Sequence, residues 1–399
     1  MAILGKVWAW AIAPLAAIAL FLSSWIVVPA PNLWLLPLGV GAPEVSPFLL
    51  LIQAILLGLA LLLKVSGPLK PLVIAMAAMG LVLSSLPLLQ VPATVERAEA
   101  QMQSFGPDYG DQLPPNGQPF LRSSPFALVD LLGGLPEGAI VPERQTVVTP
   151  DGAALALEIY QPPSAQGPHP AIVTIYGGAW RQGSPDATAR FSSYMAAQGY
   201  TVFAIDYRHA PEHRFPTQLE DVQTALAWAR DRTATYGIDP NRMALVGWSA
   251  GAHLAMLAAY APGALPLRAV VSYYGPVNLA AGYYDPPVPD PIDTTAVLEA
   301  FLGGNPEQLP DLYQQASPVF AVRPGLPPTL LIYGQRDHLV QLSYGQQMYE
   351  QLTRSGNPAA LIVIPWAEHA FDAVFRGPGN QIALYHTERF LAWALRPAP

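Results

Sequence analysis

The residues VGWSAG, at positions 246–251, decide how this chain folds. An apolar run at 243–246 leads into them and an alanine-rich amphipathic run at 250–260 leads out, which predicts a strand, a sharp turn and a helix. Gly247 and Gly251 flank Ser249 at the spacing of a nucleophile elbow, where a strained turn lifts the serine hydroxyl above a sheet. The pattern predicts that Ser249 is a nucleophile; the alternative is a tight turn with a capping serine.

Strand and helix patterns alternate on both sides of this turn. Five β-rich runs occupy residues 171–176, 200–205, 269–273, 329–333 and 360–364. Four helical patterns occupy residues 187–198, 218–230, 342–354 and 381–395. A hairpin is predicted from 146–148 and 155–160, around the turn signal at 150–152. The alternation predicts an α/β fold with a mostly parallel central sheet and helices on both faces. A proline- and aspartate-rich insert at 282–310, with one short helix at 294–302, is expected over the strand ends where substrate enters.

A serine hydroxyl needs a base to take its proton, and the base needs an acid to orient it. Asp337 stands just beyond the run 329–333, and His369 stands in the loop after 360–364. Their order along the chain, Ser249, Asp337 and His369, is the order of α/β-hydrolase triads. We therefore predict that His369 is the base and that Asp337 orients it.

Other titratable residues near these positions are weaker candidates. Glu368 and Asp372 are too close in sequence to the predicted base to orient it easily. His338 would have to reach back, and His253 lies inside the helix that follows the elbow. His386, on the last helix, is interpreted as a solvated side chain.

An oxyanion needs backbone donors, and small residues follow the run 171–176 directly. Such residues let amide groups turn inward with no side chain in the way. The predicted donors are the amides of Gly177, Gly178, Ala179 and Ala250. The alternative is an ordinary Gly-Gly turn. Trp180 and Trp248, beside these turns, are the candidates for lining the substrate pocket.

Residues 155–395 resemble the α/β-hydrolase superfamily. Within it, they are similar to hormone-sensitive-lipase-like carboxylesterases and to the feruloyl-esterase-like and prenylcysteine-methylesterase-like groups. The motifs are GGAW at 177–180, DYR at 206–208, APE at 210–212, FP at 215–216 and GWSAG at 247–251. The resemblance implies the same triad roles, no metal and no cofactor, and it makes Asp206 and Arg208 look like a structural pair. This chain has Tyr176 where the family usually has His, so the hydrogen bonds that support the oxyanion loop do not carry over.

The first ninety residues differ from the rest of the chain in containing long apolar runs. Apolar runs at 7–28, 48–63 and 72–89 approach the length that spans a bilayer. We predict a membrane region at 1–92 with about three transmembrane helices, a linker at 93–137 and the hydrolase domain at 138–399. Short helices are expected at 94–105 and 123–132 in the linker. The alternatives are one or two spans, a cleaved signal peptide or a buried helical bundle.

The few charges of this region set its expected orientation. Lys6 precedes the first run, Glu44 lies between the first and second, and Lys64 and Lys70 lie between the second and third. The positive-inside rule then places the hydrolase domain on the extracytoplasmic side. Three tryptophans near the ends of the first run fit an interfacial belt: Trp8, Trp10 and Trp25. The partly apolar stretch 32–40 is also expected at the interface.

The composition limits the classes of partner. The chain has 399 residues, a net charge of −8 and no cysteine, which argues against nucleic acid and excludes disulfides and thiolate chemistry. The sequence therefore predicts a membrane-anchored serine carboxylesterase acting on a small-molecule or lipid-like ester, with its oligomeric state open. The alternatives are an acyltransferase or amidase using the same triad, or a non-catalytic membrane protein with a hydrolase fold.

Overall fold

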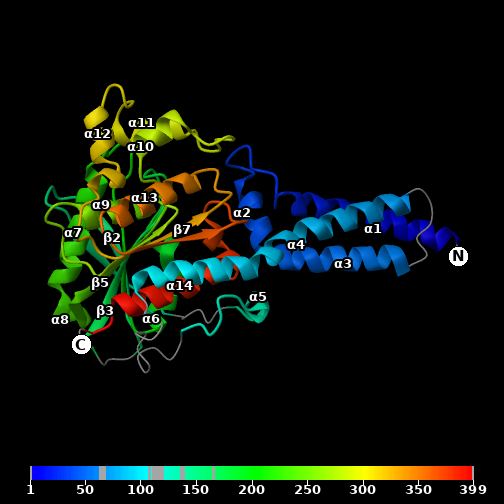
Figure 1. Ribbon diagram of the computed structural model, residues 1–399, viewed down its shortest axis with the longest axis horizontal. Helices are drawn as coiled ribbons and strands as arrows, with labels where there is room; N and C mark the ends of the chain where they lie inside the picture. Colours follow the sequence, from blue (N-terminus) through cyan, green and yellow to red (C-terminus); the bar gives the residue numbers. More distant parts are fainter. Residues whose placement is uncertain are drawn as a thin grey trace.

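The computed structural model of the chain describes residues 2–62, 69–106, 109, 121–134, 140–163 and 167–397, with side chains from residue 11 onward. Figure 1 shows a narrow bundle of helices, which contains the N-terminus, and a wider domain built on a β-sheet. Lys64 and the side chains of Lys6, Trp8 and Trp10 lie outside the described residues.

The sheet of the wider domain has eight strands in the order β1-β2-β4-β3-β5-β6-β7-β8. Their bounds are β1 Glu143–Val148, β2 Ala154–Tyr160, β3 His169–Ile175, β4 Thr201–Ile205, β5 Ile238–Trp248, β6 Ala269–Tyr273, β7 Thr329–Gly334 and β8 Ala359–Ile364. Strand β2 pairs antiparallel with β1 and β4, and all other pairs are parallel. The predicted hairpin and the mostly parallel sheet are confirmed. The carboxyl ends of the parallel strands share one edge, where ligand sites of such sheets form.

Helices cover both faces of the sheet. Helices α7 Thr217–Asp231, α9 Ala250–Tyr260 and α13 Leu342–Arg354 lie on one face, with the short α8 Thr233–Tyr236 after α7. The other face is covered by α6 Ala189–Ala197, which follows the 3₁₀ turn η2 Pro185–Thr188, and by α14 Pro378–Ala394. Tyr194 of α6 donates a hydrogen bond to Glu388 of α14. Pro378 stands in the first turn of α14, where a missing amide proton costs nothing.

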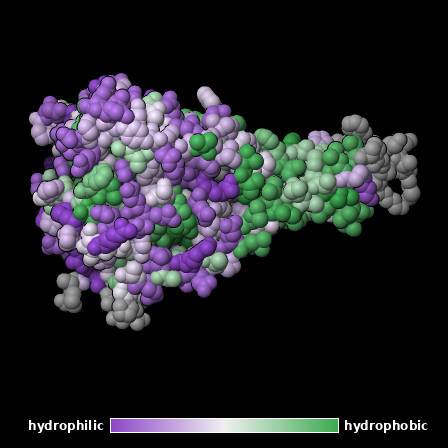
Figure 2. Space-filling view, turned by 45° about the horizontal axis from the view of Figure 1, so that its top comes forward, coloured by the Kyte–Doolittle hydropathy of each residue, from purple (hydrophilic) through white to green (hydrophobic). Residues whose placement is uncertain are grey.

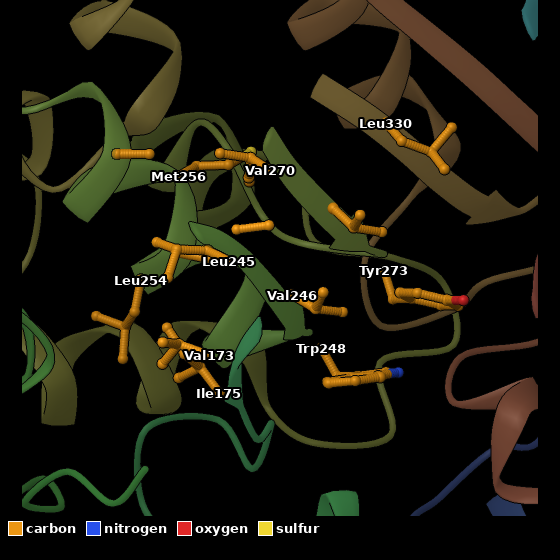
Figure 3. Close-up of a cluster of buried hydrophobic side chains, with 14 of the residues drawn as sticks. Val173, Ile175, Leu245, Val246, Trp248, Leu254, Met256, Val270, Tyr273 and Leu330 are labelled. Carbon is orange, nitrogen blue, oxygen red and sulfur yellow. The ribbon is translucent and has the colours of Figure 1, made fainter. Parts of the chain in front are cut away.

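The core lies between the central strands and these helices. Figure 3 shows Leu245 and Val246 of β5 beside Val173 of β3, Val270 of β6 and Leu254 of α9. All five side chains are 0% exposed. A strand covered on both faces buries consecutive side chains, which is why residues 243–246 of β5 form a continuous apolar run. This packing fixes the end of β5 and the start of α9, and so holds the turn between them.

The insert over the strand ends contains more helix than expected. The predicted helix is present as α11 Thr294–Leu302, and Asp293 caps it by accepting from the Ala296 amide at 3.2 Å. Two further short helices, α10 Leu279–Tyr284 and α12 Pro310–Gln315, stand before and after it, and the turn η3 Pro318–Ala321 follows. Asn278 caps α10 in the same way.

The N-terminal bundle consists of α1 Ala2–Ser24, α2 Leu36–Glu44, α3 Ser46–Leu62 and α4 Leu69–Met102. Helices α1, α3 and α4 pack against one another, and Figure 2 shows a hydrophobic surface around them. Among the described residues one helix, Leu69–Phe105, is long and apolar enough to cross a membrane. The pair α2 and α3, bent by 77°, would be a second if it forms one span. Three crossings therefore remain a prediction.

The linker differs from the expected arrangement. Helix α4 runs on through residue 92 and continues as the 3₁₀ turn η1 Gln103–Phe105, so the boundary expected at 92 lies inside one helix. Phe105 packs on Phe390 and Trp393 of α14, at ring distances of 4.8 Å and 5.2 Å, and this contact extends the helix onto the domain. The helix expected at 123–132 is the shorter α5 Leu128–Gly133.

Tryptophan placement in the bundle also differs from expectation. Trp25 is 8% exposed, because it packs in a cluster with the buried residues Ile26, Ala30, Ala42 and Leu49. Trp34, in the loop between α1 and α2, is 92% exposed instead. Of these two residues, Trp34 is the one available for an interface.

Candidate active site

Ser249 stands between the last residue of β5 and the first residue of α9, with φ 51° and ψ −121°. A non-glycine residue adopts positive φ only when its surroundings impose it. A Cβ at Gly247 would lie 2.4 Å from the Gly251 carbonyl oxygen, and one at Gly251 would lie 2.1 Å from the Ile175 carbonyl oxygen. Both flanking positions therefore require glycine, and the turn has the strained geometry that the sequence predicts.

The side chains of Ser249, His369 and Asp337 form one chain of hydrogen bonds. His369 Nε2 is 3.0 Å from Ser249 Oγ, and His369 Nδ1 is 2.7 Å from Asp337 Oδ2. The second carboxylate oxygen, Asp337 Oδ1, accepts from the backbone amides of Leu339 and Val340 at 2.8 Å and 2.7 Å. These two bonds fix the carboxylate, which in turn fixes the orientation of the imidazole ring.

The surroundings of His369 tune its proton affinity. Burial alone lowers its pKa, but the negative charge of Asp337 and the hydrogen bond to it outweigh burial and raise the pKa above 6.5. An imidazole held beside a buried carboxylate accepts a proton readily, which suits a general base.

The rival carboxylates have other partners. Glu368 binds His338 Nδ1 at 2.6 Å and accepts from the His338 amide, also at 2.6 Å. Asp372 accepts a hydrogen bond from the Tyr274 hydroxyl, and burial raises the pKa of Asp372. Neither carboxylate bonds to a ring nitrogen of His369, whereas Asp337 does.

Two other histidines are buried and neutral. His253 accepts a hydrogen bond from Trp180 Nε1 at 3.2 Å and donates to the Ala316 carbonyl at 2.6 Å, and burial lowers its pKa to about 4. The interpretation of His386 as solvated is wrong: it is 2% exposed, and burial lowers its pKa to about 3. His386 shares a helix face with Phe390, four residues on, and the end of α4 and Phe105 cover that part of α14.

The candidate oxyanion loop follows β3 and presses against the elbow. Gly178 has φ +136°, and a Cβ there would lie 1.9 Å from the Gln182 carbonyl oxygen. Ala179 also has positive φ, at 53°. Within the described residues the amides of Gly178, Ala179 and Ala250 donate no hydrogen bond, and all three residues line the same pocket as Ser249. Gly177 lies against the elbow, since a Cβ there would be 2.8 Å from the Trp248 carbonyl oxygen.

Tyr176 supports this loop in place of a histidine. Its hydroxyl donates to Asp206 Oδ1 at 2.5 Å and lies 2.9 Å from His209 Nε2. Its ring stacks on Tyr207 at 4.5 Å, and the Tyr207 hydroxyl donates back to the Tyr176 carbonyl at 3.2 Å. Burial raises the pKa of Tyr176, which keeps the phenol protonated as a donor.

The expected pairing of Asp206 with Arg208 is wrong. Arg208 binds Asp221 and Asp151 instead, each at 2.6 Å. Asp206 accepts from the Tyr176 hydroxyl and from the Tyr207 amide, so its carboxylate belongs to the support of the oxyanion loop. Arg208 pairs with Asp221 because both oxygens of this buried carboxylate accept hydrogen bonds from the guanidinium group.

A cavity of about 720 Å³ opens over Ser249 and His369. Trp180 and Trp248 both line it. Trp180 stacks on Phe301 at 4.2 Å, and Trp248 stacks on Tyr273 at 5.3 Å, so both indoles are held rigidly. The insert contributes apolar side chains to the wall: Pro287, Ile292, Val297 and Leu298. No group of three His, Asp or Glu side chains in the described part of the chain is arranged to hold a metal ion.

Contacts with the N-terminal bundle brace the loops that carry His369 and Asp337. Glu44, 1% exposed, accepts from Trp366 Nε1 at 3.0 Å and from the Gly379 amide at 2.7 Å. Arg336 donates to the Val27 carbonyl at 2.5 Å. These contacts are not predicted from the sequence. A signal was available, since Glu44 is the first acidic residue of the chain and stands in an apolar region, where a carboxylate is costly without partners.

Known proteins match the wider domain. Residues 157–352 match the BD-FAE family. Esterase LipC of Mycobacterium tuberculosis is 32% identical over 57% of this chain, and the chain spans only 60% of LipC. Carboxylesterase NlhH of the same species is 30% identical over 59% of this chain and 76% of NlhH. The solved structure of Thermogutta terrifontis esterase 2 phosphonylated by sarin is 25% identical, with a TM-score of 0.54 over 66% of this chain and 99% of that one.

Proposed function

Because the chain belongs to the esterase family of α/β-hydrolases, we propose that it is a membrane-anchored serine carboxylesterase that forms an acyl-enzyme on Ser249. The observation that carries the proposal is the hydrogen-bonded series from Ser249 Oγ through the His369 ring to Asp337, at 3.0 Å and 2.7 Å. An arrangement of nucleophile, base and orienting acid makes a serine hydroxyl reactive toward an ester carbonyl.

Acylation uses each of these groups in turn. Ser249 Oγ attacks the carbonyl carbon of the ester while His369 Nε2 takes the hydroxyl proton, and Asp337 stabilises the imidazolium that forms. The carbonyl oxygen becomes negative and is stabilised by the unpaired amides of Gly178, Ala179 and Ala250. When the tetrahedral intermediate collapses, the bond to the alcohol oxygen breaks and His369 gives its proton to the leaving alcohol.

Deacylation repeats the same steps with water. A water molecule loses a proton to His369 and attacks the acyl carbon, after which the proton returns to Ser249 and the carboxylic acid leaves. The pocket wall is mostly apolar around Trp180, Trp248 and the insert, which favours an acyl group with hydrocarbon character. We propose that the substrate is a small or lipid-like acyl ester.

The anchor is supported by the length and apolar character of Leu69–Phe105 and by the apolar surface of the bundle. We propose that helices α1, α3 and α4 cross the membrane and that the hydrolase domain lies on the extracytoplasmic side. The distribution of Lys6, Lys64 and Lys70 favours this orientation, because lysines of short loops stay in the cytoplasm.

The activity is tested on the purified full-length protein. A panel of p-nitrophenyl esters of graded acyl length should be hydrolysed by the wild type and left intact by Ser249→Ala. Product analysis by mass spectrometry should find the free acid when water is the only acceptor. Transfer of the acyl group to an added alcohol or amine in preference to water would instead identify an acyltransferase, and lack of turnover on every ester would reject the proposed activity.

A further inference from the structure

One residue of the N-terminal region lines the candidate active site. Leu33, in the loop between α1 and α2, contributes to the wall of the same cavity as Ser249 and His369. Figure 1 shows this loop, in dark blue, next to the segment that leads into α11. That segment supplies Pro287 and Ile292 to the same wall. The cavity is thus closed partly by the anchor region and partly by the insert.

Both sides of this part of the wall carry an exposed apolar side chain. Trp34, next to Leu33, is 92% exposed, and Val288, next to Pro287, is 91% exposed. Both residues are sequence neighbours of the pocket wall, and large apolar side chains that stay exposed at one place mark contact with an apolar phase or partner. Tryptophan in particular favours the boundary between membrane and water.

The loop that holds Trp34 starts at the end of a bundle helix. Helix α1 ends at Ser24, and Val28, four residues later, is 46% exposed. The Val27 carbonyl is tied to Arg336 of the domain at 2.5 Å, so this loop lies where the bundle meets the domain. If the bundle spans the bilayer, the loop with Leu33 and Trp34 lies at the membrane surface on the side of the hydrolase domain.

A second apolar surface lies beside the same junction. Helix α5, which Figure 1 places next to the base of the bundle, exposes three apolar side chains. They are Leu128, Val129 and Leu132, at 59%, 69% and 73% exposure. Exposed apolar residues in the loop with Trp34 and in α5, both around the base of the bundle, are consistent with contact between this side of the domain and the lipid surface.

We propose that the substrate is an ester lipid of the adjacent leaflet, and that its acyl chain enters the cavity directly from the bilayer between Leu33 and Pro287. The proposal rests on the proposed esterase function and membrane anchor. A long acyl chain is poorly soluble in water, and an opening at the membrane surface lets it pass from lipid to the apolar cavity without crossing water. In this arrangement the side chains of Trp34 and Val288 insert into the membrane surface and keep the opening of the cavity in contact with lipid.

The test compares two substrates in one preparation. The full-length protein is reconstituted in phosphatidylcholine vesicles with a fluorogenic long-chain ester dissolved in the bilayer, and p-nitrophenyl acetate serves as the water-soluble substrate. Trp34→Ser and Val288→Ser should each lower hydrolysis of the embedded ester severalfold and leave acetate hydrolysis unchanged. Because both side chains are almost fully exposed, little packing is lost, and the acetate rate reports that the site is intact.

Val141→Ser is the matched control. Val141 is 88% exposed and precedes β1, which runs in the same direction as β4, so Val141 lies toward the edge of the sheet opposite the active site. This variant should change neither rate. Equal effects of Trp34→Ser and Val141→Ser on hydrolysis of the embedded ester would overturn the proposal that the substrate enters from the bilayer. Unchanged hydrolysis of the embedded ester in both Trp34→Ser and Val288→Ser would overturn it as well. Loss of acetate hydrolysis in the wild type would instead reject the esterase function itself.

Discussion

Trp366 donates its indole N–H to Glu44 at 3.0 Å, which joins the loop of His369 to the end of α2 in the N-terminal bundle. The same carboxylate accepts from the Gly379 amide at the start of α14. One buried side chain of the N-terminal bundle thus holds two segments of the hydrolase domain, and the bundle takes part in positioning the site.

Replacing Glu44 with Ala should lower both stability and turnover. The change leaves the buried Trp366 Nε1 and the Gly379 amide without acceptors, at a cost of about 1–3 kcal/mol for each group. The melting temperature should fall, and kcat should fall more than KM rises, because the loop of His369 loses its support. Glu99→Ala, an exposed glutamate on α4, is the control and should change neither quantity. A melting temperature and kcat equal to those of the wild type in Glu44→Ala would contradict this role.

Removing the Tyr176 hydroxyl should slow catalysis without blocking binding. Tyr176→Phe keeps the stacked ring but loses the hydrogen bond to Asp206, so the oxyanion loop is less firmly held. We expect kcat to fall by about tenfold to a hundredfold, somewhat less than when an oxyanion donor is removed outright, with little change in KM. Tyr349→Phe removes the same atom from a half-buried tyrosine on α13 and should be neutral. Equal kinetics in the two variants would show that the phenol does not support the loop.

The activity should depend on pH through His369. The Asp337 charge raises the pKa of His369 above 6.5 by favouring the protonated ring, and only the neutral ring can take the serine proton. The acidic limb of kcat/KM should therefore have its midpoint above pH 6.5, and activity should be lost as pH falls through that midpoint.

Asp337→Asn removes the charge that raises this pKa. Burial then dominates, so the acidic limb should move to lower pH while turnover falls by about 10⁴. Asp372→Asn is the control, because Asp372 bonds to Tyr274 and not to the ring of His369. A large loss of turnover in Asp372→Asn with Asp337→Asn unaffected would reassign the acid.

The triad side chains should act as one unit. Ser249→Ala alone and Ser249→Ala combined with His369→Ala should have nearly the same residual turnover, since the imidazole has no function without the hydroxyl. Steady-state rates of the single and double variants on one ester give this comparison. A further large loss in the double variant would mean that His369 contributes to turnover by a route that does not involve Ser249.

The orientation of the anchor can be measured in intact cells. A reporter that is active only outside the cytoplasm should be active when fused after residue 397, and the same reporter inserted between residues 64 and 70 should be inactive. Protease added to spheroplasts should digest the hydrolase domain. Protection of the domain until the membrane is dissolved would contradict the extracytoplasmic location and point to an even number of spans.

Local patterns predicted the hydrolase domain well. The glycines around Ser249 and the apolar run before it specify a strand, a turn and a helix with few alternatives, because side chains at either glycine would clash with backbone. The close approach of Asp337 and His369 was predictable for a related reason, since residues just beyond parallel strands meet at one edge of the sheet. Helix α13 follows from its strongly amphipathic sequence and has the predicted bounds.

Contacts between distant segments were not predictable from local patterns. His386 is buried on α14, a helix on which α4 and Phe105, hundreds of residues earlier, pack. Arg208 forms its ion pair with Asp221 and not with Asp206, because the fold places the buried Asp221 carboxylate beside the guanidinium group. The boundary predicted at residue 92 lies inside α4, whose end has a packing partner in α14 through Phe105 that local sequence does not reveal.

The central claim is that Ser249 is the nucleophile, and covalent labelling tests it most directly. The purified protein is treated with a fluorophosphonate probe, digested and sequenced by mass spectrometry, with Ser249→Ala treated in parallel. The account predicts one modified residue, Ser249, in the wild type and no modification in the variant. A phosphonylated side chain elsewhere in the folded wild type, with Ser249 unmodified, would contradict it.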